Sequence, residues 1–120
     1  MWMLIDAISC SKTSIYTICN GYAMSAAFQL FLAGHKRYIT PHATLMYHQI
    51  YCWRSGKYQD LVDDREHTDL LNSQIENYVI KRSKLTQEDL ATIRGGKKQD
   101  TYFTAEEAIE RGLADEIFGT

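Results

Sequence analysis

Three kinds of residue in this sequence could combine into a nucleophilic site: a serine, a histidine and a carboxylate. Ser25 follows a predicted strand and Gly21, in the first turn of a predicted apolar helix. The N–H groups and positive dipole end of a helix start could stabilise an oxyanion there. The segment Gly21-Tyr-Ala-Met-Ser25 departs from the G-x-S-x-G nucleophile motif. On spacing alone, a serine near a helix start is more often a cap or a small packing residue.

His48 closes the apolar segment Leu-Met-Tyr-His, which predicts a buried strand. Functional sites of α/β proteins gather at strand ends, so His48 is a candidate site residue. The simpler alternative is a histidine whose ring bonds a backbone carbonyl. We expect His35 and His42 in loops and His67 on an acidic helix, all three solvated. No pair of histidines has a metal-ligand spacing, and the sequence therefore predicts no metal site.

Several carboxylates could orient such a histidine. Asp100 lies in a predicted loop just before Tyr102, and Asp115 lies near a predicted C-terminal strand. The acidic run from Asp60 to Asp69 is most simply a solvated helix face. The residue pattern alone does not choose among them.

The elements that must position these residues follow a strand, buried helix, strand order, which is typical of a mainly parallel sheet. We expect the end of a helix over Met1–Ile8. A strand, an interior helix and two further strands are then expected over Ser14–Cys19, Ala23–Ala33, Arg37–Thr40 and Leu45–Gln49.

A long helix is predicted over Gln59–Ser83, with an apolar stripe at Leu71, Ile75, Tyr78 and Val79. Thr86 with Asp89, and Thr104 with Glu107, have the spacing of capping boxes that open two short helices. The second of these helices should stop at Gly112, before a strand-like segment over Leu113–Phe118.

Composition excludes several classes of protein. The 120 residues are 45% hydrophobic and 23% charged, which is typical of one folded domain rather than a disordered chain. The net charge of −2 gives no reason to expect a nucleic-acid or anionic-membrane partner. The longest apolar run, over Ala23–Gly34, is shorter than the roughly 20 residues of a membrane span.

Features of the termini and the cysteines favour a cytoplasmic location. The first residues, MWMLIDAISC, lack a basic region and make a poor signal peptide. Cys10, Cys19 and Cys52 match no disulfide or metal pattern, so we expect reduced thiols, with Cys19 buried in a strand.

Several segments, in order, resemble the ATP-dependent Clp protease proteolytic subunit family, ClpP. They are Gly21-Tyr-Ala-Met-Ser25-Ala-Ala, Leu32-Ala-Gly34, Lys36-Arg37-Tyr38, Pro41, Met46-Tyr47-His48-Gln49, Asp100-Thr-Tyr-Phe-Thr104-Ala-Glu-Glu-Ala108 and Gly112-Leu-Ala-Asp115. The resemblance covers nearly the whole chain.

The resemblance implies a serine endopeptidase with a Ser25-His48-Asp100 triad. Ser25 matches the nucleophile, His48 the general base and Asp100 the acid that orients the imidazole. The backbone N–H of Ala26 matches one oxyanion donor. No cofactor is implied.

The resemblance also implies an architecture and partners. The fold would be an α/β crotonase-like spiral of βαβ units, forming one domain over residues 1–120. Residues 50–83 would form a protruding helix-strand handle that joins stacked, heptameric rings. An AAA+ unfoldase would use the ATP and deliver unfolded polypeptides, because this chain has no phosphate-binding G-x-x-x-x-G-K-[ST] loop. No nucleic-acid or membrane partner is expected.

The sequence departs from the family pattern in three places. The family's upstream S-P-G-G segment, which supplies the other oxyanion N–H, has no match, so we expect the N-terminal part of the fold to be absent. Gln99 replaces an arginine common in the family, and Cys52 and Trp53 stand where many members have glycines. Alternatives are therefore an impaired assembly or regulatory subunit, a phage-type head-maturation protease, and an acyl-CoA enzyme of the crotonase fold. The Ser25-His48-Asp100 set argues against the last.

Overall fold

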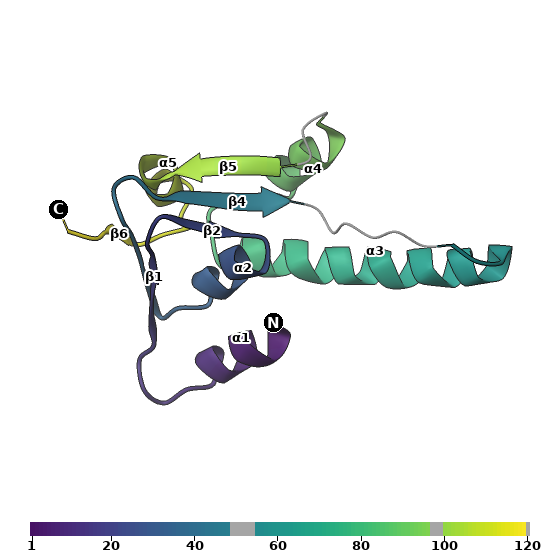
Figure 1. Ribbon diagram of the computed structural model, residues 1–120, viewed down its shortest axis with the longest axis horizontal. Helices are drawn as coiled ribbons and strands as arrows, with labels where there is room; N and C mark the ends of the chain where they lie inside the picture. Colours follow the sequence, from purple (N-terminus) through teal and green to yellow (C-terminus); the bar gives the residue numbers. More distant parts are fainter. Residues whose placement is uncertain (49–54, 97–99, 120) are drawn as a thin grey trace.

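Helices and strands are interspersed along the chain in the computed structural model, which describes residues 1–48, 55–96 and 100–119 (Figure 1). The predicted mixed α/β class is confirmed. In chain order the elements are α1 (Trp2–Ser9), β1 (Tyr16–Cys19), β2 (Tyr22–Met24), α2 (Ala26–Leu32), β3 (Lys36–Ile39), β4 (Thr44–His48), α3 (Tyr58–Lys81), α4 (Gln87–Gly95), β5 (Asp100–Thr104), α5 (Ala105–Glu110) and β6 (Glu116–Ile117).

The described strands form two three-stranded sheets rather than one mainly parallel sheet. β3 lies between β1 and β6 and is parallel to both, and β4 lies between β2, which is parallel, and β5, which is antiparallel. Two expectations were wrong here, because β2 occupies the predicted start of the helix over Ala23–Ala33 and Asp100 lies in β5 rather than in a loop. Both strands are short and owe their extended form to pairing with β4, which a local pattern does not report.

The buried helix α2 packs beside both sheets, and its Phe28, Phe31 and Leu32 are buried as the apolar pattern predicted. The Tyr47 ring from β4 packs against Phe28 with ring centroids 5.8 Å apart. The Tyr47 hydroxyl is buried without a hydrogen-bond partner among the described residues, and burial raises the pKa of Tyr47 to about 12. Residues from α2, β3, β4, α3, α4 and the α5–β6 turn complete this core, including Ile39, Leu45, Val79, Leu90 and Leu113.

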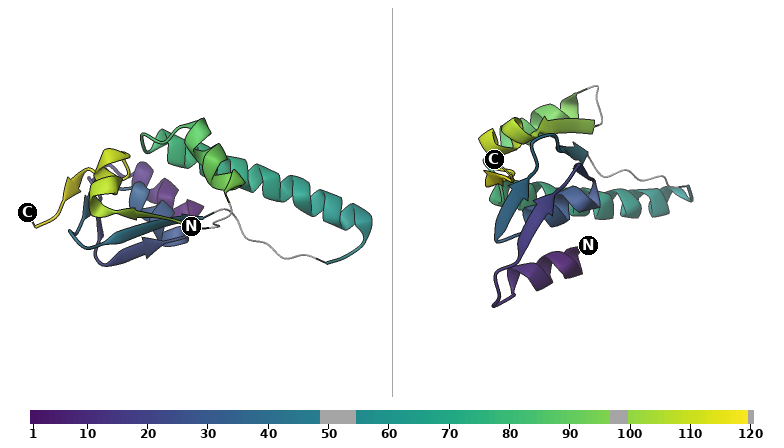
Figure 2. Two further views of the ribbon diagram at one scale, coloured as in Figure 1. Left: turned by 90° about the horizontal axis from the view of Figure 1, so that it is seen from above. Right: turned by 60° about the vertical axis from the view of Figure 1, so that its left-hand side comes forward.

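The long helix α3 projects from the rest of the molecule, as both Figure 1 and Figure 2 show. Its buried residues, Glu76 and Val79, both lie in its C-terminal half. In the projecting half, Tyr58 is 81% exposed. Three residues of the predicted stripe face the core, since Val79 is buried and Ile75 and Tyr78 pack against it, while Leu71 is only half-buried.

Two capping boxes and one glycine set the ends of the short helices. Thr86 and Asp89 cap α4 reciprocally, and Thr104 and Glu107 cap α5 in the same way, which confirms both predictions. Gly112 ends the α5 segment with a φ of +69°, and a Cβ there would lie 2.9 Å from the backbone nitrogen of Lys84. Only glycine meets both conditions without strain.

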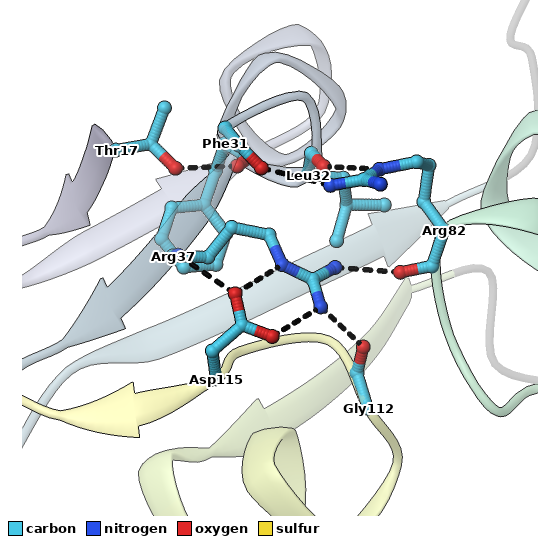
Figure 3. A network of polar contacts seen from close by, with 8 residues as sticks. Thr17, Phe31, Leu32, Arg37, Arg82, Gly112 and Asp115 are labelled. Carbon is cyan, nitrogen blue, oxygen red and sulfur yellow. Dashed lines mark hydrogen bonds and ion pairs between the residues drawn. The ribbon is translucent and has the colours of Figure 1, made fainter. Parts of the chain in front are cut away.

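A buried arginine on β3 joins three parts of the chain (Figure 3). Arg37 is 7% exposed and its guanidinium donates to both carboxylate oxygens of Asp115, at 3.1 Å and 2.8 Å. It also donates to the carbonyls of Arg82, at the end of α3, and of Gly112. A desolvated guanidinium is tolerated only when its charge and N–H groups are matched in this way.

Arg82 continues this network toward α2. Its guanidinium donates to the carbonyls of Leu32 and Gly34, each at 2.8 Å (Figure 3). These carbonyls lie at the C-terminal end of α2, where backbone acceptors lack intrahelical donors. One side chain therefore ties the end of α3 to the end of α2.

Some expectations fall outside the described residues. These concern Gln49, the strand part of the expected handle over 50–54 with Cys52 and Trp53, and Gln99. Cys10 and Cys19 are free thiols, and Cys19 is buried in β1 as predicted, which raises its pKa. No helix in the described ranges is long and apolar enough to cross a membrane.

The Arg37–Asp115 pair makes folding depend on pH. The hydrogen bonds from Arg37 hold the pKa of Asp115 below its usual value. Because the folded-state pKa is the lower one, this carboxylate stabilises the fold above its unfolded-state pKa of about 3.9. The contribution is lost as the pH falls through the lowered folded-state pKa.

Asp115→Asn should therefore lower the free energy of unfolding at pH 7 by about 1–3 kcal/mol, because it leaves the buried Arg37 charge uncompensated. The difference from wild type should shrink below pH 3. Urea unfolding at both pH values measures it. Glu116→Gln is the matched control, since its ion pair with Lys36 is exposed and should contribute less than about 1 kcal/mol. Equal losses in the two variants would contradict the assigned role of Arg37.

Candidate active site

Ser25 occupies the sharp turn between β2 and α2 in a backbone conformation that side chains rarely adopt. Its φ is +59° and its ψ is −122°, and it is the one non-glycine residue with a positive φ among the described residues. Such a conformation costs roughly 1–3 kcal/mol and needs support. The Ser25 N–H donates to the Met46 carbonyl at 3.3 Å, and its carbonyl accepts from the Gln29 N–H at 3.2 Å.

The Ser25 side chain meets a histidine instead of capping the helix. Its hydroxyl makes no capping hydrogen bond to α2, although Ser25 is the N-cap residue. His48 Nε2 lies 2.9 Å from Ser25 Oγ. β2 pairs with β4 in parallel, with Met24 opposite Met46, so the ends of the two strands bring the serine and the histidine together.

Asp100 lies beside His48 through strand pairing. The two residues are direct partners in the antiparallel β4–β5 register. Side chains of such partners lie on the same face of a sheet, with Cβ atoms about 4.5–5.5 Å apart. Ser25, His48 and Asp100 therefore come from three segments that meet at one end of the β2-β4-β5 sheet.

The other candidate carboxylates are used elsewhere. Asp115 accepts three hydrogen bonds from Arg37, including one from its backbone N–H at 2.8 Å. The acidic run from Asp60 to Asp69 lies on the N-terminal, projecting half of α3. Of the alternatives that the sequence left open, the strand register favours Asp100.

The start of α2 offers a donor next to the serine. Ala26 is the first residue of α2, and N–H groups in a first helical turn lack intrahelical acceptors. The first turn of α2 contains no acidic residue that would neutralise the positive end of its dipole. An anion forming beside Ser25 would meet this N–H.

The other three histidines are His35, His42 and His67, and the sequence predicted no metal site among them. His42 and His67 are exposed, as expected, while exposed His35 accepts a hydrogen bond at Nδ1 from the Ile15 N–H at 2.8 Å. Within the ranges that the structure describes, no group of three or more His, Cys, Asp or Glu residues could hold a metal ion.

Sequence reasoning missed the strained turn at Ser25. The available signal was the pair of small residues two positions before and after it, Ala23 and Ala27, where the G-x-S-x-G motif has glycines. Alanine keeps the turn uncrowded, as glycine does, but it does not match the motif.

The strain at Ser25 is testable without any assay of activity. Ser25→Gly should be more stable to urea than Ser25→Ala by about 1 kcal/mol or more, because glycine adopts a φ of +59° without a Cβ penalty. At Ser14, which lies in an exposed loop, the same pair of substitutions should favour alanine or differ little. A more stable Ser25→Ala variant would contradict the strained conformation.

Comparison with known proteins shows the family of this chain. The family model described as Clp protease matches residues 1–120. The chain is 34% identical to ATP-dependent Clp protease proteolytic subunit 4 of Rhodococcus jostii, over 98% of this chain and 60% of that protein. It is 32% identical to subunit 2 of Streptomyces avermitilis, over 95% of this chain and 57% of that protein. The chain thus spans little more than half the length of these relatives, and it belongs to the Clp protease family.

Proposed function

We propose that this chain is a serine endopeptidase subunit of the Clp type, with Ser25 as nucleophile, His48 as general base and Asp100 as the orienting acid. The observation that carries the proposal is the 2.9 Å contact between His48 Nε2 and Ser25 Oγ at a strained strand-to-helix turn. A nucleophile and base within hydrogen-bond reach, with a third group beside the base, are the requirements for an activated serine. Membership of the Clp protease family supports the same reaction.

The proposed reaction starts with proton transfer from Ser25 to His48. The serine oxygen attacks the carbonyl carbon of a peptide bond, and His48 Nε2 takes the hydroxyl proton. His48 then returns the proton to the leaving amine, and a water repeats the sequence to release the acyl group. Asp100 keeps the proton of the neutral imidazole on Nδ1 and stabilises the imidazolium.

The Ala26 N–H is the proposed oxyanion donor on this chain. Its place in the first turn of α2 directs it toward the turn that carries Ser25. A second donor is needed for full rate, since loss of one oxyanion donor costs about 10²–10³ in kcat. In the family the S-P-G-G segment supplies this second donor, and that segment has no match in this sequence.

The architecture proposed for the assembled enzyme is the crotonase-like spiral, with residues 1–120 in one domain and residues 50–83 as its handle. The projection of α3 supports the handle (Figure 1, Figure 2). The exposed apolar residues Leu61 and Leu70 on α3 support its use as a contact between copies of the chain in stacked rings.

Substrates and partners follow from the family. The proposed substrates are unfolded polypeptides, and the proposed partner is an AAA+ unfoldase that uses the ATP. The names of the relatives, which describe proteolytic subunits of ATP-dependent Clp proteases, support proteolysis that depends on ATP. The reduced cysteines favour a cytoplasmic location, and this stays a prediction.

Labelling with a fluorophosphonate tests the nucleophile. Intact mass should show one adduct on wild type and on Ser73→Ala, an exposed serine of α3, and none on Ser25→Ala. The reason is that only a serine with an adjacent base reacts readily with the phosphorus centre. Circular dichroism and native mass, recorded on the same samples, report folding and assembly.

Each result has a defined meaning. An adduct that persists on Ser25→Ala would overturn the assignment of Ser25. A folded, assembled wild type that takes no adduct would overturn the peptidase proposal and favour the assembly or regulatory subunit.

Asp100→Asn tests the acid. It should slow phosphonylation of Ser25 by the fluorophosphonate by about 10³–10⁴, because the amide favours the wrong imidazole tautomer of His48. Asp6→Asn, an exposed aspartate on α1, should leave the rate unchanged. If Asp100→Asn reacts at the wild-type rate, another group orients His48.

A further inference from the structure

A polar hollow lies where the end of α3 meets the α5–β6 turn. Its volume is about 490 Å³. Arg37 and Asp115, whose contacts are drawn in Figure 3, both line it, and Ser25, His48 and Asp100 are not among its described lining residues. The charged residues that line it are Arg37, Lys81, Arg82, Lys84 and Asp115.

The hollow carries an excess of positive charge. Among the described residues that line it, four are cationic and Asp115 is the one carboxylate. Asp115 is fully engaged by Arg37, so three positive charges remain without a local counter-charge. The chain as a whole has a net charge of −2, so this excess is a local feature.

The donors of these cations are available. Neither Lys81 nor Lys84 has a carboxylate within ion-pair distance in the described part of the chain. The Arg82 guanidinium uses one Nε–H and one Nη–H on the carbonyls of Leu32 and Gly34. Its other three N–H groups are left for a ligand.

These positive charges are not needed to satisfy the carbonyl groups at the C-terminal end of α3. The carbonyls of Tyr78, Val79 and Ile80 accept from the N–H groups of Arg82 and Ser83, and Arg37 donates to the Arg82 carbonyl. The dipole of α3 adds only about half a negative charge at this end. Half a charge is too little to balance an excess of three.

We propose that this hollow binds a pyrophosphate or short polyphosphate group. A guanidinium fork and two mobile ammonium groups are the donors that recognise phosphoryl oxygens, and their charge matches a polyanion rather than a single carboxylate. The volume accommodates more than one phosphoryl group. No aromatic residue is among the described residues that line the hollow, so a nucleobase would have no stacking partner among them.

The base of the hollow is rigid. Lys84 N–H donates to the Arg111 carbonyl at 2.8 Å, and Gly112 packs against the Lys84 backbone without room for a Cβ. Arg37 and Arg82 are each held by carbonyl partners. A ligand would therefore order mainly the two lysine side chains, which limits the entropy lost on binding.

Equilibrium dialysis of the whole chain against radiolabelled pyrophosphate in low salt measures this binding directly. The double variant Lys81→Gln, Lys84→Gln should raise the Kd at least tenfold while keeping Arg37 and its network. The matched control Lys12→Gln, Lys57→Gln removes the same charge from two exposed lysines that do not line the hollow, and should change the Kd less than threefold. Circular dichroism confirms that both variants fold.

Two results would overturn the proposal: no pyrophosphate bound to wild type at millimolar concentration, or equal weakening in the two double variants, which would mean attraction by net charge alone. The readout is binding rather than peptide hydrolysis. The proposal therefore stands or falls separately from the proposed peptidase activity.

Discussion

The placement of α2 is the constraint on which the candidate site depends. This helix has seven residues and is about 10 Å long, so it has few hydrogen bonds of its own to hold its direction. Its N-terminal end is fixed by the Ser25 N–H on the Met46 carbonyl, and its C-terminal end by the Arg82 guanidinium on the carbonyls of Leu32 and Gly34. Arg82 is in turn located by Arg37, whose charge is matched by Asp115. The serine thus keeps its position relative to His48 because both ends of one short helix are attached to the sheets.

The strained backbone conformation at Ser25 is tolerated because the elements on either side of the turn are well packed. Phe28 and Leu32 on α2 are fully buried, and so is Leu45 on β4. Burial of each such side chain contributes about 1.5–3 kcal/mol, so the three together outweigh the roughly 1–3 kcal/mol cost of one unfavourable φ. The same packing fixes β4, and hence the position of His48 relative to Ser25. The packed residues of α2 and β4 therefore support both the strained turn at Ser25 and its contact with His48.

Local patterns predicted the elements whose form depends on their own residues. Capping at Thr86 and Thr104 and the buried face at Val79 are set within a few positions of sequence, and the structure has them as expected. β2 and β5 were missed because each is a short strand formed by pairing with β4. The family resemblance named Ser25, His48 and Asp100 in advance. Their geometry could not be predicted, because it depends on the pairing of β4 with both β2 and β5. It also depends on the positive φ of Ser25, which no local motif indicated.

The two halves of α3 differ in what stabilises them. The C-terminal half buries Val79, and its Glu76 forms an ion pair with Arg94 of α4, with Arg94 Nε 2.8 Å from Glu76 Oε1. The projecting half buries no residue, and its local support is of the kind made by Gln59 with Asp63 and by Arg65 with Asp69, four residues apart. Such pairs contribute only about 0.2–0.5 kcal/mol each.

A projecting helix with so little packing is marginal in water, because helices draw most of their stability from a buried apolar face. Tyr58 and Leu61 in this half, and Leu70 just after it, are apolar residues that remain exposed in the single chain. Contact with another copy would bury them and supply the packing that the single chain lacks. The physical requirement of α3 therefore supports the proposed assembly through the handle, independently of the family resemblance that first suggested it.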